Sequence, residues 1–341
     1  MKAETIKLIK GDDLHCHLRR GKILESVAIF TARQFKRATI MPNTNPPILT
    51  AEDVIKYRHE IYECCWDDGW KEFEPLMTIQ INDYTTPKMI TQAKRAGVIA
   101  GKVYPQGVTT NSQNGVTNFG ALYPVFREMQ NLNMLLLLHG ESPKPGVFCL
   151  DREEKFFSTL VAIAEEFPKL KIVLEHITTG KAVQVVSMLK NVAATITVHH
   201  LLLTLDDIVG GFISPHNFCK PIAKRPEDKK VLLMAATSGN PKFFYGGDSA
   251  PHLKENKECR QGCAGVFNAP VALPLLAQIF EECNKLDRLE NFVSKFGADF
   301  YGLPRNSETI ELIKKDWVVP DEYDGIVPFI AGQTLHWQIA S

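Results

Sequence analysis

The chain has 341 residues, enough for one large domain or two ordinary ones, and α/β barrels commonly need more than about 200 residues in one piece. Apolar residues make up 45% and charged residues 23%, which is typical of a globular enzyme with a sizeable core. Basic and acidic residues both number 39, so the formal net charge is zero and no overall field favours nucleic acid or an acidic membrane surface.

The sequence also bears on where the protein works. Residues 1–13 are too polar for a secretory signal, and no apolar run approaches the roughly 18 residues of a membrane-spanning helix. The eight cysteines show no spacing typical of a disulfide framework or a zinc ribbon, which indicates reduced thiols. We therefore expect a cytoplasmic protein with no membrane partner.

Short apolar runs recur along the chain and predict β-strands. Each run is nearly continuous rather than alternating, as expected for parallel strands that are covered on both faces. In chain order, the predicted strands cover residues 5–17, 37–43, 73–81, 97–105, 134–140, 171–177, 193–200 and 242–252.

Amphipathic segments between these runs predict helices. One helix starts at Thr50, with Asp53 three residues later as in a capping box, and a second starts at Asp151 with Glu154 in the same relation. A third has its apolar residues at helical spacing, namely Leu122, Val125, Phe126 and Met129. Eight strands alternating with helices predict an α/β fold, a closed (β/α)₈ TIM barrel over residues 1–341 as a single domain, with a C-terminal extension from about residue 305.

Residues of the types that bind metals lie at the ends of the predicted strands. In chain order they are His15 and His17, Asn43, Lys102, His139, His176, His199 and His200, and Asp248. His15 and His17 are two residues apart, so on a strand both imidazoles face the same side. Because active sites of such barrels lie at the carboxyl ends of the strands, these residues predict a metal site there rather than a solvated surface.

Lys102 is unusual because it follows "VIAG" on a predicted buried strand, where a bare ammonium is costly and would repel cations. A buried lysine readily loses its proton, and the neutral amine can add carbon dioxide to form a carbamate that bridges two cations. A lysine that reaches solvent or contacts a substrate anion is the alternative, but the surrounding histidines favour the bridging role.

Several motifs together resemble the dihydroorotase family of the amidohydrolase superfamily, in its shorter bacterial and fungal form. They are "HCHLR", "MPNTNPP", "GKVYP", "LLHGE", "EHITT", "GGDSAPH" and "GCAGVFNAP". The similarity runs from about residue 11 to the C-terminal "FYGLP" and "VPFIAG", so it covers nearly the whole chain. It implies a reversible, metal-dependent hydrolysis of dihydroorotate to N-carbamoyl-L-aspartate in pyrimidine biosynthesis.

The resemblance also implies a binuclear metal centre at the carboxyl ends of the strands. His15, His17, carbamylated Lys102 and Asp248 would hold the more buried metal ion, and Lys102, His139 and His176 the other. Two Zn²⁺ ions per subunit are expected, together with carbon dioxide or bicarbonate to modify Lys102 to N6-carboxylysine. Asp248 would be the catalytic residue that moves the proton. A homodimer is also what the family suggests.

The resemblance assigns further positions to the substrate and to a lid. Arg19, Asn43, His252 and the backbone at Ala264 match positions that bind the substrate carboxylate, and Arg19 offers a planar fork suited to it. Thr109 and Thr110 lie in the polar segment 107–117, where the family has a loop that closes over the substrate.

Two features fit the family pattern less well. Lys220, in "FCKPIAKR", stands where many bacterial relatives have an apolar residue; the family uses main-chain atoms there, so the side chain can point away. His199 and His200 exceed the expected ligand number, and His200 is interpreted as a packing or supporting residue while His199 has no assigned role.

Other readings of the same residues remain open. A hydantoinase, an allantoinase or a related deaminase would share the metal ligands, although Arg19, Asn43 and His252 favour an acidic substrate. An inactive barrel that acts as a scaffold for a partner enzyme would have lost ligands, whereas all six matching positions are filled here.

Overall fold

The protein is a barrel of parallel strands surrounded by helices. The computed structural model describes residues 4–67 and 69–340, and within them eight parallel strands form one sheet in the order of the sequence. These strands are β2 (Gly11–Cys16), β3 (Phe35–Ile40), β4 (Glu74–Ile81), β5 (Ala100–Val103), β6 (Leu135–His139), β7 (Ile172–Glu175), β8 (Val192–Ile196) and β9 (Phe243–Tyr245). Seven of the eight predicted strands are therefore confirmed, and the first predicted strand contains one barrel strand and part of another sheet.

The sheet closes where the segment after β9 meets the end of β2. The backbone N–H of Asp248 donates to the carbonyl of His15 at 2.7 Å, and that of His17 donates to the carbonyl of Ser249 at 3.0 Å. A parallel bridge joins Cys16 to Ser249. Because closure is made through these residues, the backbone itself brings Asp248 beside His15 and His17.

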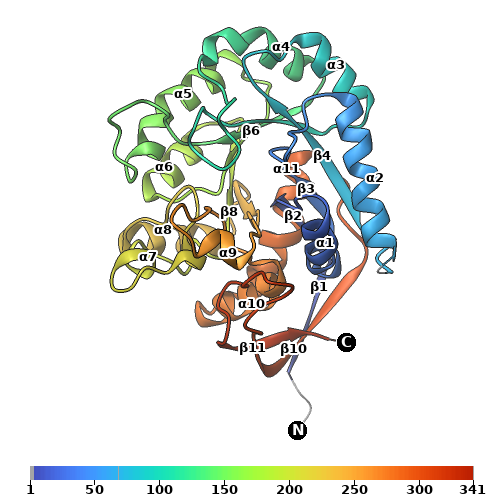
Figure 1. Cartoon of the computed structure of the whole chain (residues 1–341), viewed down its shortest axis with the longest axis vertical. Helices are drawn as coiled ribbons and strands as arrows, with labels where there is room; N and C mark the ends of the chain where they lie inside the picture. The colour runs from blue at the N-terminus through green and yellow to red at the C-terminus, as the bar shows by residue number, and fades with distance from the viewer. Residues whose placement is uncertain (1–3, 68, 341) are drawn as a thin grey trace.

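Helices cover the outside of the barrel. They are α1 (Lys22–Gln34), α2 (Ala51–Asp67), α3 (Pro87–Arg95), α4 (Tyr123–Asn131), α5 (Arg152–Glu166), α6 (Gly180–Met188), α7 (Asp206–Val209), α8 (Pro226–Thr237), α9 (Lys254–Lys257), α10 (Ala272–Glu282) and α11 (Phe296–Tyr301). Figure 1 shows α2 to α6 following one another around the strands. No helix in the described chain combines the length and apolar character needed to cross a bilayer.

The helices predicted to start at Thr50 and Asp151 do start there, but only the first has the predicted capping box. At α2, Asp53 Oδ2 accepts from the backbone N–H of Thr50 at 2.8 Å, and Thr50 Oγ1 accepts from that of Asp53 at 3.2 Å, which is the expected capping box. The box predicted at α5 is wrong, because Asp151 is already near helical geometry (φ −99°, ψ −6°) and Glu154 binds Lys181 at 2.7 Å instead.

The first predicted strand, residues 5–17, is in fact two strands in two sheets. β1 (Thr5–Ile9) pairs antiparallel with β10 (Thr309–Val318), which in turn pairs with β11 (Thr334–Ile339) in a small sheet at one side of the molecule (Figure 1). The chain then enters the barrel at Gly11, where a Cβ would lie only 2.4 Å from the carbonyl oxygen of Val293. Glycine is therefore required at this change of direction.

A buried ion pair joins the first two barrel strands below the site. Arg37 donates from Nε and Nη2 to the two carboxylate oxygens of Asp12 at 2.8 and 2.7 Å, and Asn306 Nδ2 donates to Asp12 at 2.9 Å. Both charged residues are buried. Removing one partner of such a pair leaves the other charge without compensation, which is more costly than losing an exposed pair.

We expect Arg37→Met to lower the free energy of unfolding by about 3–5 kcal/mol in urea denaturation followed by circular dichroism. The matched control is Arg305→Met, because Arg305 makes the same two-pronged contact to Asp299 on the exposed surface, where the loss should be much smaller. Equal losses in the two variants would show that burial does not strengthen the inner pair.

Candidate functional site

The residues predicted to bind metal are brought together at the carboxyl ends of the barrel strands. His15 lies in β2, Lys102 in β5 and His139 at the end of β6, while His17, His176 and Asp248 follow β2, β7 and β9. All six side chains are buried, with exposed fractions of 0–9%. The barrel thus collects imidazoles, a carboxylate and an amine in one place.

Three ligand atoms converge between β2 and the segment after β9. His15 Nε2 lies 3.3 Å from His17 Nε2 and 3.3 Å from Asp248 Oδ1, and His17 Nε2 lies 3.0 Å from Asp248 Oδ1. His15 Nδ1 donates to Glu175 Oε2 at 2.8 Å, so His15 Nε2 carries a lone pair toward the aspartate. Facing lone pairs repel one another, and a cation between them relieves the repulsion.

The other two histidines lie next to this group. The ring of His176 is 4.9 Å from that of His15 and 4.8 Å from that of His139, centroid to centroid. His176 Nδ1 is buried and has no hydrogen-bond partner among the described residues, and ligand atoms of His15, His176 and Asp248 lie within 4.8 Å of one another. His139 Nε2 contacts Glu141 Oε2 at 3.0 Å, so the Nδ1 atom of His139 is the one left to bind a metal ion.

Burial keeps these imidazoles neutral. Loss of solvent is the largest cause that lowers the pKa of all four histidines, and it lowers the pKa of His15 and His176 furthest. The positive charge of Lys102 adds to this effect on each of them. Neutral imidazole is the form that binds a metal ion.

Lys102 is fully buried, and in the described part of the chain its Nζ has no hydrogen-bond partner. The amine lies 5.1 Å from the centre of the Tyr104 ring. Burial lowers the pKa of Lys102 to about 8, while the carboxylates of Glu175 and Asp248 act in the opposite direction. A substantial neutral fraction near physiological pH makes this amine a nucleophile, as carbamate formation requires.

Arg19 and its neighbours form a polar group beside the metal-ligand residues. Arg19 Nε donates to the carbonyl of Pro251 at 3.1 Å, and Arg19 Nη2 lies 3.0 Å from His252 Nε2, which lies 3.1 Å from the carbonyl of Ala264. Burial, followed by the charge of Arg19, lowers the pKa of His252 to about 3. The structure therefore brings Arg19, His252 and Ala264 together.

Asn43 links the loop 107–117 to this group. Asn43 Nδ2 donates to the carbonyl of Thr110 at 3.1 Å, and Thr110 Oγ1 donates to the carbonyl of Ala264 at 3.3 Å. Asn43 Oδ1 is buried without a partner in the described chain. The backbone N–H of Thr109 donates to Ser112 Oγ at 3.0 Å, so Thr109 is held within the loop. Asn111 Nδ2 also donates to the carbonyl of Asn43 at 3.0 Å, so the loop contacts the site through both Thr110 and Asn111.

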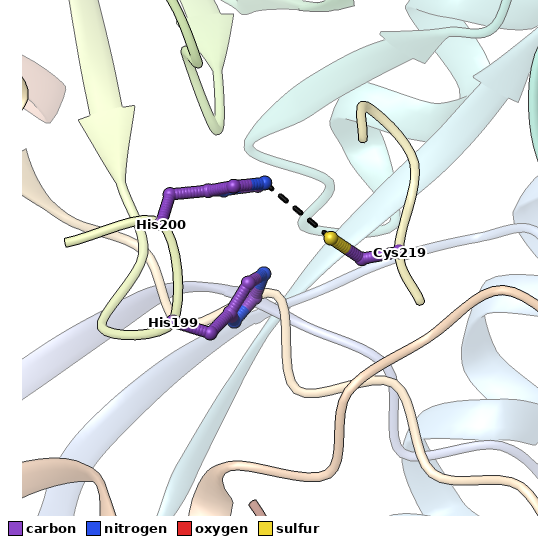
Figure 2. A group of neighbouring side chains, drawn as sticks. All are labelled: His199, His200 and Cys219. Carbon is purple, nitrogen blue, oxygen red and sulfur yellow. Dashed lines mark hydrogen bonds between the residues drawn. The ribbon is translucent and has the colours of Figure 1, made fainter. Parts of the chain in front are cut away.

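His199 and His200 lie apart from the six predicted ligands, in a buried group with Cys219 (Figure 2). His200 Nε2 lies 3.4 Å from Cys219 Sγ and 3.0 Å from the carbonyl of Pro221. Asn268 Nδ2 donates to His199 Nδ1 at 2.9 Å and also donates to the carbonyl of Gly247.

That hydrogen bonding argues against a metal site at this group. Since His199 Nδ1 accepts from an amide, the proton of a neutral ring is on Nε2, the atom that faces Cys219 and His200. A protonated nitrogen cannot bind a metal. His200 instead supports the segment of Cys219 to Pro221, which contains the half-buried Lys220. A supporting role is what the sequence predicted for His200.

Some residues of the site were not singled out from the sequence. Glu175 binds His15, Glu141 binds His139, and Asp13 accepts from the backbone N–H groups of His15 and Gly247 at 3.1 and 2.7 Å. Burial raises the pKa of both Glu175 and Asp13 to about 7. The available signal was a carboxylate one or two positions from a histidine in the sequence, as in Asp13 and His15, His139 and Glu141, and Glu175 and His176.

Several site residues have a left-handed backbone. The φ angles of Arg19, His176 and Asp248 are 60°, 40° and 45°. Such conformations cost a non-glycine residue about 1–3 kcal/mol and persist where the surrounding structure holds them. These three residues are all predicted site residues. The strained backbone therefore holds their side chains in a fixed direction, at a cost in local stability.

Comparisons with known proteins agree with this geometry, although a scan against protein-family models found no match. A curated dihydroorotase of Teredinibacter turnerae is 48% identical over 342 residues, 98% of this chain and 99% of the relative. A crystal structure of dihydroorotase from Saccharomyces cerevisiae with 5-fluoroorotic acid has a TM-score of 0.92 at 40% identity and covers 98% of each chain. A dihydroorotase structure from Campylobacter jejuni also has a TM-score of 0.92, at 41% identity, and covers 100% of this chain and 99% of its own.

More distant structures share the architecture alone. An L-hydantoinase from Arthrobacter aurescens has a TM-score of 0.79 at 14% identity, covering 98% of this chain and 83% of its own. An inactive dihydroorotase-like domain from Chaetomium thermophilum has a TM-score of 0.69 at 15% identity, covering 98% and 92%. At such low identity, these similarities support neither a hydantoinase nor an inactive scaffold as the function of this chain.

Proposed function

The chain belongs to the dihydroorotase family, and from this premise we propose which of its residues carry out the reaction. The protein is a metal-dependent cyclic amide hydrolase that interconverts (S)-dihydroorotate and N-carbamoyl-L-aspartate in pyrimidine biosynthesis. The observation that carries the assignment of residues is the convergence of His15 Nε2, His17 Nε2 and Asp248 Oδ1 at about hydrogen-bond distance in a buried site.

The metal ligands are proposed as two sets that share one residue. His15, His17, Lys102 and Asp248 form the first set, and Lys102, His139 and His176 form the second. The unpartnered Lys102 Nζ and His176 Nδ1 support this assignment, because buried polar atoms without partners are costly unless something binds them. Two Zn²⁺ ions would suit these imidazole and carboxylate ligands, and a carbamate on Lys102, formed from carbon dioxide, would supply oxygen ligands to both sets.

Proton movement is assigned to Asp248. Bound metal ions of this kind lower the pKa of a coordinated water and polarise a carbonyl oxygen. The carboxylate of Asp248 accepts the proton of the attacking water and delivers it to the ring nitrogen as the amide C–N bond breaks. Ring closure uses the same groups in reverse, with Asp248 taking the proton from the ureido nitrogen.

The substrate carboxylate is proposed to bind at Arg19, Asn43 and His252, with the backbone at Ala264 and at Lys220 completing the site. In the described chain the partly buried Arg19 guanidinium has no carboxylate partner, which supports this, since the bonds it makes are to Pro251 and His252. An arginine fork is suited to a carboxylate that arrives with the substrate.

The loop 107–117 is proposed as a lid. Thr110 contacts Ala264 and Asn43, both proposed substrate residues, so opening of the loop would expose them and closing would exclude water. We also propose that the chain is a single barrel domain with the segment from about residue 305 as an extension, and that it acts as a cytoplasmic homodimer.

The test is a comparison of two cyclic amides. Purified enzyme should hydrolyse dihydroorotate and close the ring of N-carbamoyl-L-aspartate, whereas hydantoin, which lacks the carboxylate, should be a far poorer substrate. Chelation should abolish both reactions, and added Zn²⁺ should restore them. Equal rates on both amides would favour a hydantoinase, and inertness of the metal-loaded protein would favour a scaffold.

A prediction concerns Glu175, which accepts hydrogen bonds from His15 Nδ1 and Thr195 Oγ1 at 2.8 and 2.6 Å. Glu175→Gln weakens the orientation of His15, so the affinity for Zn²⁺ should fall by roughly 10–100-fold. Competition with a chromophoric chelator measures it, and activity should return in excess Zn²⁺. Glu154→Gln, at an exposed ion pair with Lys181, is the control. An unchanged affinity in Glu175→Gln would contradict the proposed orientation of His15.

A further inference from the structure

We propose that Lys257 is a positioning residue that determines specificity for an anionic substrate. Its ammonium group joins the two backbone segments that present Lys220 and Ala264, and it adds a positive charge that is linked to Arg19 through Gly265 and His252. The proposal rests on the function proposed above and goes beyond it, because Lys257 belongs to none of the residues assigned there. It concerns the class of substrate that the site accepts.

The ammonium group of Lys257 binds two carbonyl groups from different segments. Lys257 lies at the end of the short helix α9, is only 4% exposed, and donates from Nζ to the carbonyls of Phe218 and Gly265 at 3.0 and 2.5 Å. The two segments also touch directly, since the backbone N–H of Gly265 donates to the carbonyl of Phe218 at 2.8 Å. Lys257 therefore fixes the spacing between them.

The packing around Gly265 leaves little freedom for this spacing. A Cβ at Gly265 would lie 2.4 Å from the carbonyl oxygen of Ala250 and 3.0 Å from the ring of His252. The backbone at 264–265 thus presses against the segment that carries His252, which is itself 3.0 Å from Arg19. A shift at Lys257 would be passed to the proposed carboxylate-binding atoms.

No carboxylate pairs with the charge of Lys257 in the part of the chain that the structure describes. In residues 4–67 and 69–340, neither Lys257 nor Arg19 forms an ion pair with a carboxylate, although Lys257 is buried and Arg19 is partly buried. Burial lowers the pKa of Lys257 to about 8, and the charge of Arg19 acts in the same direction. Buried charges are normally paired, so the buried Lys257, which is linked to Arg19 through Gly265 and His252, indicates an anion that comes from outside.

The structure therefore separates two contributions of Lys257. Its hydrogen bonds hold Phe218 and Gly265, and its charge favours an anion near Arg19. A neutral side chain of similar length can replace part of the hydrogen bonding but none of the charge. Lys257→Gln and Lys257→Met are the corresponding variants, and Lys254→Met, which removes an exposed lysine from the same helix, is the matched control.

The experiment measures kinetics and binding on the metal-loaded enzyme. In both Lys257 variants the KM for dihydroorotate should rise about tenfold while kcat stays within about twofold, because a charge that acts on binding alone changes KM. The Kd of orotate, measured by calorimetry, should rise by the same factor. The affinity for dihydrouracil, the same ring without its carboxylate and measured by competition, should not change. Lys254→Met should match the parent protein.

Two results would overturn the proposal. Normal KM and orotate affinity in Lys257→Gln would show that hydrogen bonding suffices and the charge is irrelevant. Equal weakening of orotate and dihydrouracil would show a general structural defect. If Lys257→Met does not fold, Lys257→Gln decides alone. Failure of the parent enzyme to turn over dihydroorotate would instead contradict the proposed function, which keeps the two tests separate.

Discussion

Replacement of Lys102 by alanine should remove both bound metal and activity while the barrel remains folded. Without the bridging oxygens, the imidazoles of the two ligand sets no longer share a ligand, and kcat/KM for dihydroorotate should fall by roughly 10³-fold or more. Mass spectrometry measures the bound metal, a turnover assay measures the activity, and circular dichroism measures whether the barrel is folded. Lys144→Ala, at an exposed lysine after β6, is the control and should behave like the parent.

The carbamate itself has a separate test. Metal-free parent enzyme, given Zn²⁺ in buffer stripped of carbon dioxide, should regain activity only when bicarbonate is added, because the neutral amine of Lys102 must be modified before it binds metal. Native mass spectrometry should show the corresponding increase in mass. Full metal occupancy and full turnover in Lys102→Ala would refute the bridging assignment.

Asp248→Asn should be the most damaging conservative change in the site. Asparagine has nearly the same shape and can still approach His15 and His17, but its amide cannot accept the proton of the attacking water. We expect kcat to fall by roughly 10²–10⁴-fold in both directions of the reaction, with a much smaller change in KM, because Arg19 and its neighbours are untouched.

Excess metal distinguishes this variant from Glu175→Gln. Added Zn²⁺ should restore Glu175→Gln, where only the orientation of His15 is weakened, but it should not restore Asp248→Asn at full metal occupancy. Recovery of Asp248→Asn in excess Zn²⁺ would show that Asp248 serves as a ligand alone, and proton transfer would then have to be assigned to another group.

The sequence predicted the barrel because its strands are local features. Buried parallel strands consist of continuous apolar residues, and the polar residue that ends each one is visible in the same window of sequence. The division of residues 5–17 was not predictable in this way, because the partner of β1 is β10, about 300 residues away. Nothing within residues 5–17 shows that the chain changes sheets at Gly11.

The same reasoning applies to the site. His15, His17 and Asp248 were found because each ends a strand, and barrel closure then places them together. Glu175 was missed because a carboxylate beside a histidine has no distinctive spacing, and its contact to His15 crosses from β7 to β2. The surroundings of Lys257 depend on two loops, which no periodic pattern describes.

The left-handed backbone at Arg19, His176 and Asp248 has a consequence for protein engineering. Glycine adopts such angles at little cost, so a screen for heat-resistant variants would be drawn toward these positions. Each glycine accepted there would delete a guanidinium, an imidazole or a carboxylate from the reaction. A thermostabilisation library for this scaffold should therefore leave these codons unchanged and draw its gains from the outer helices.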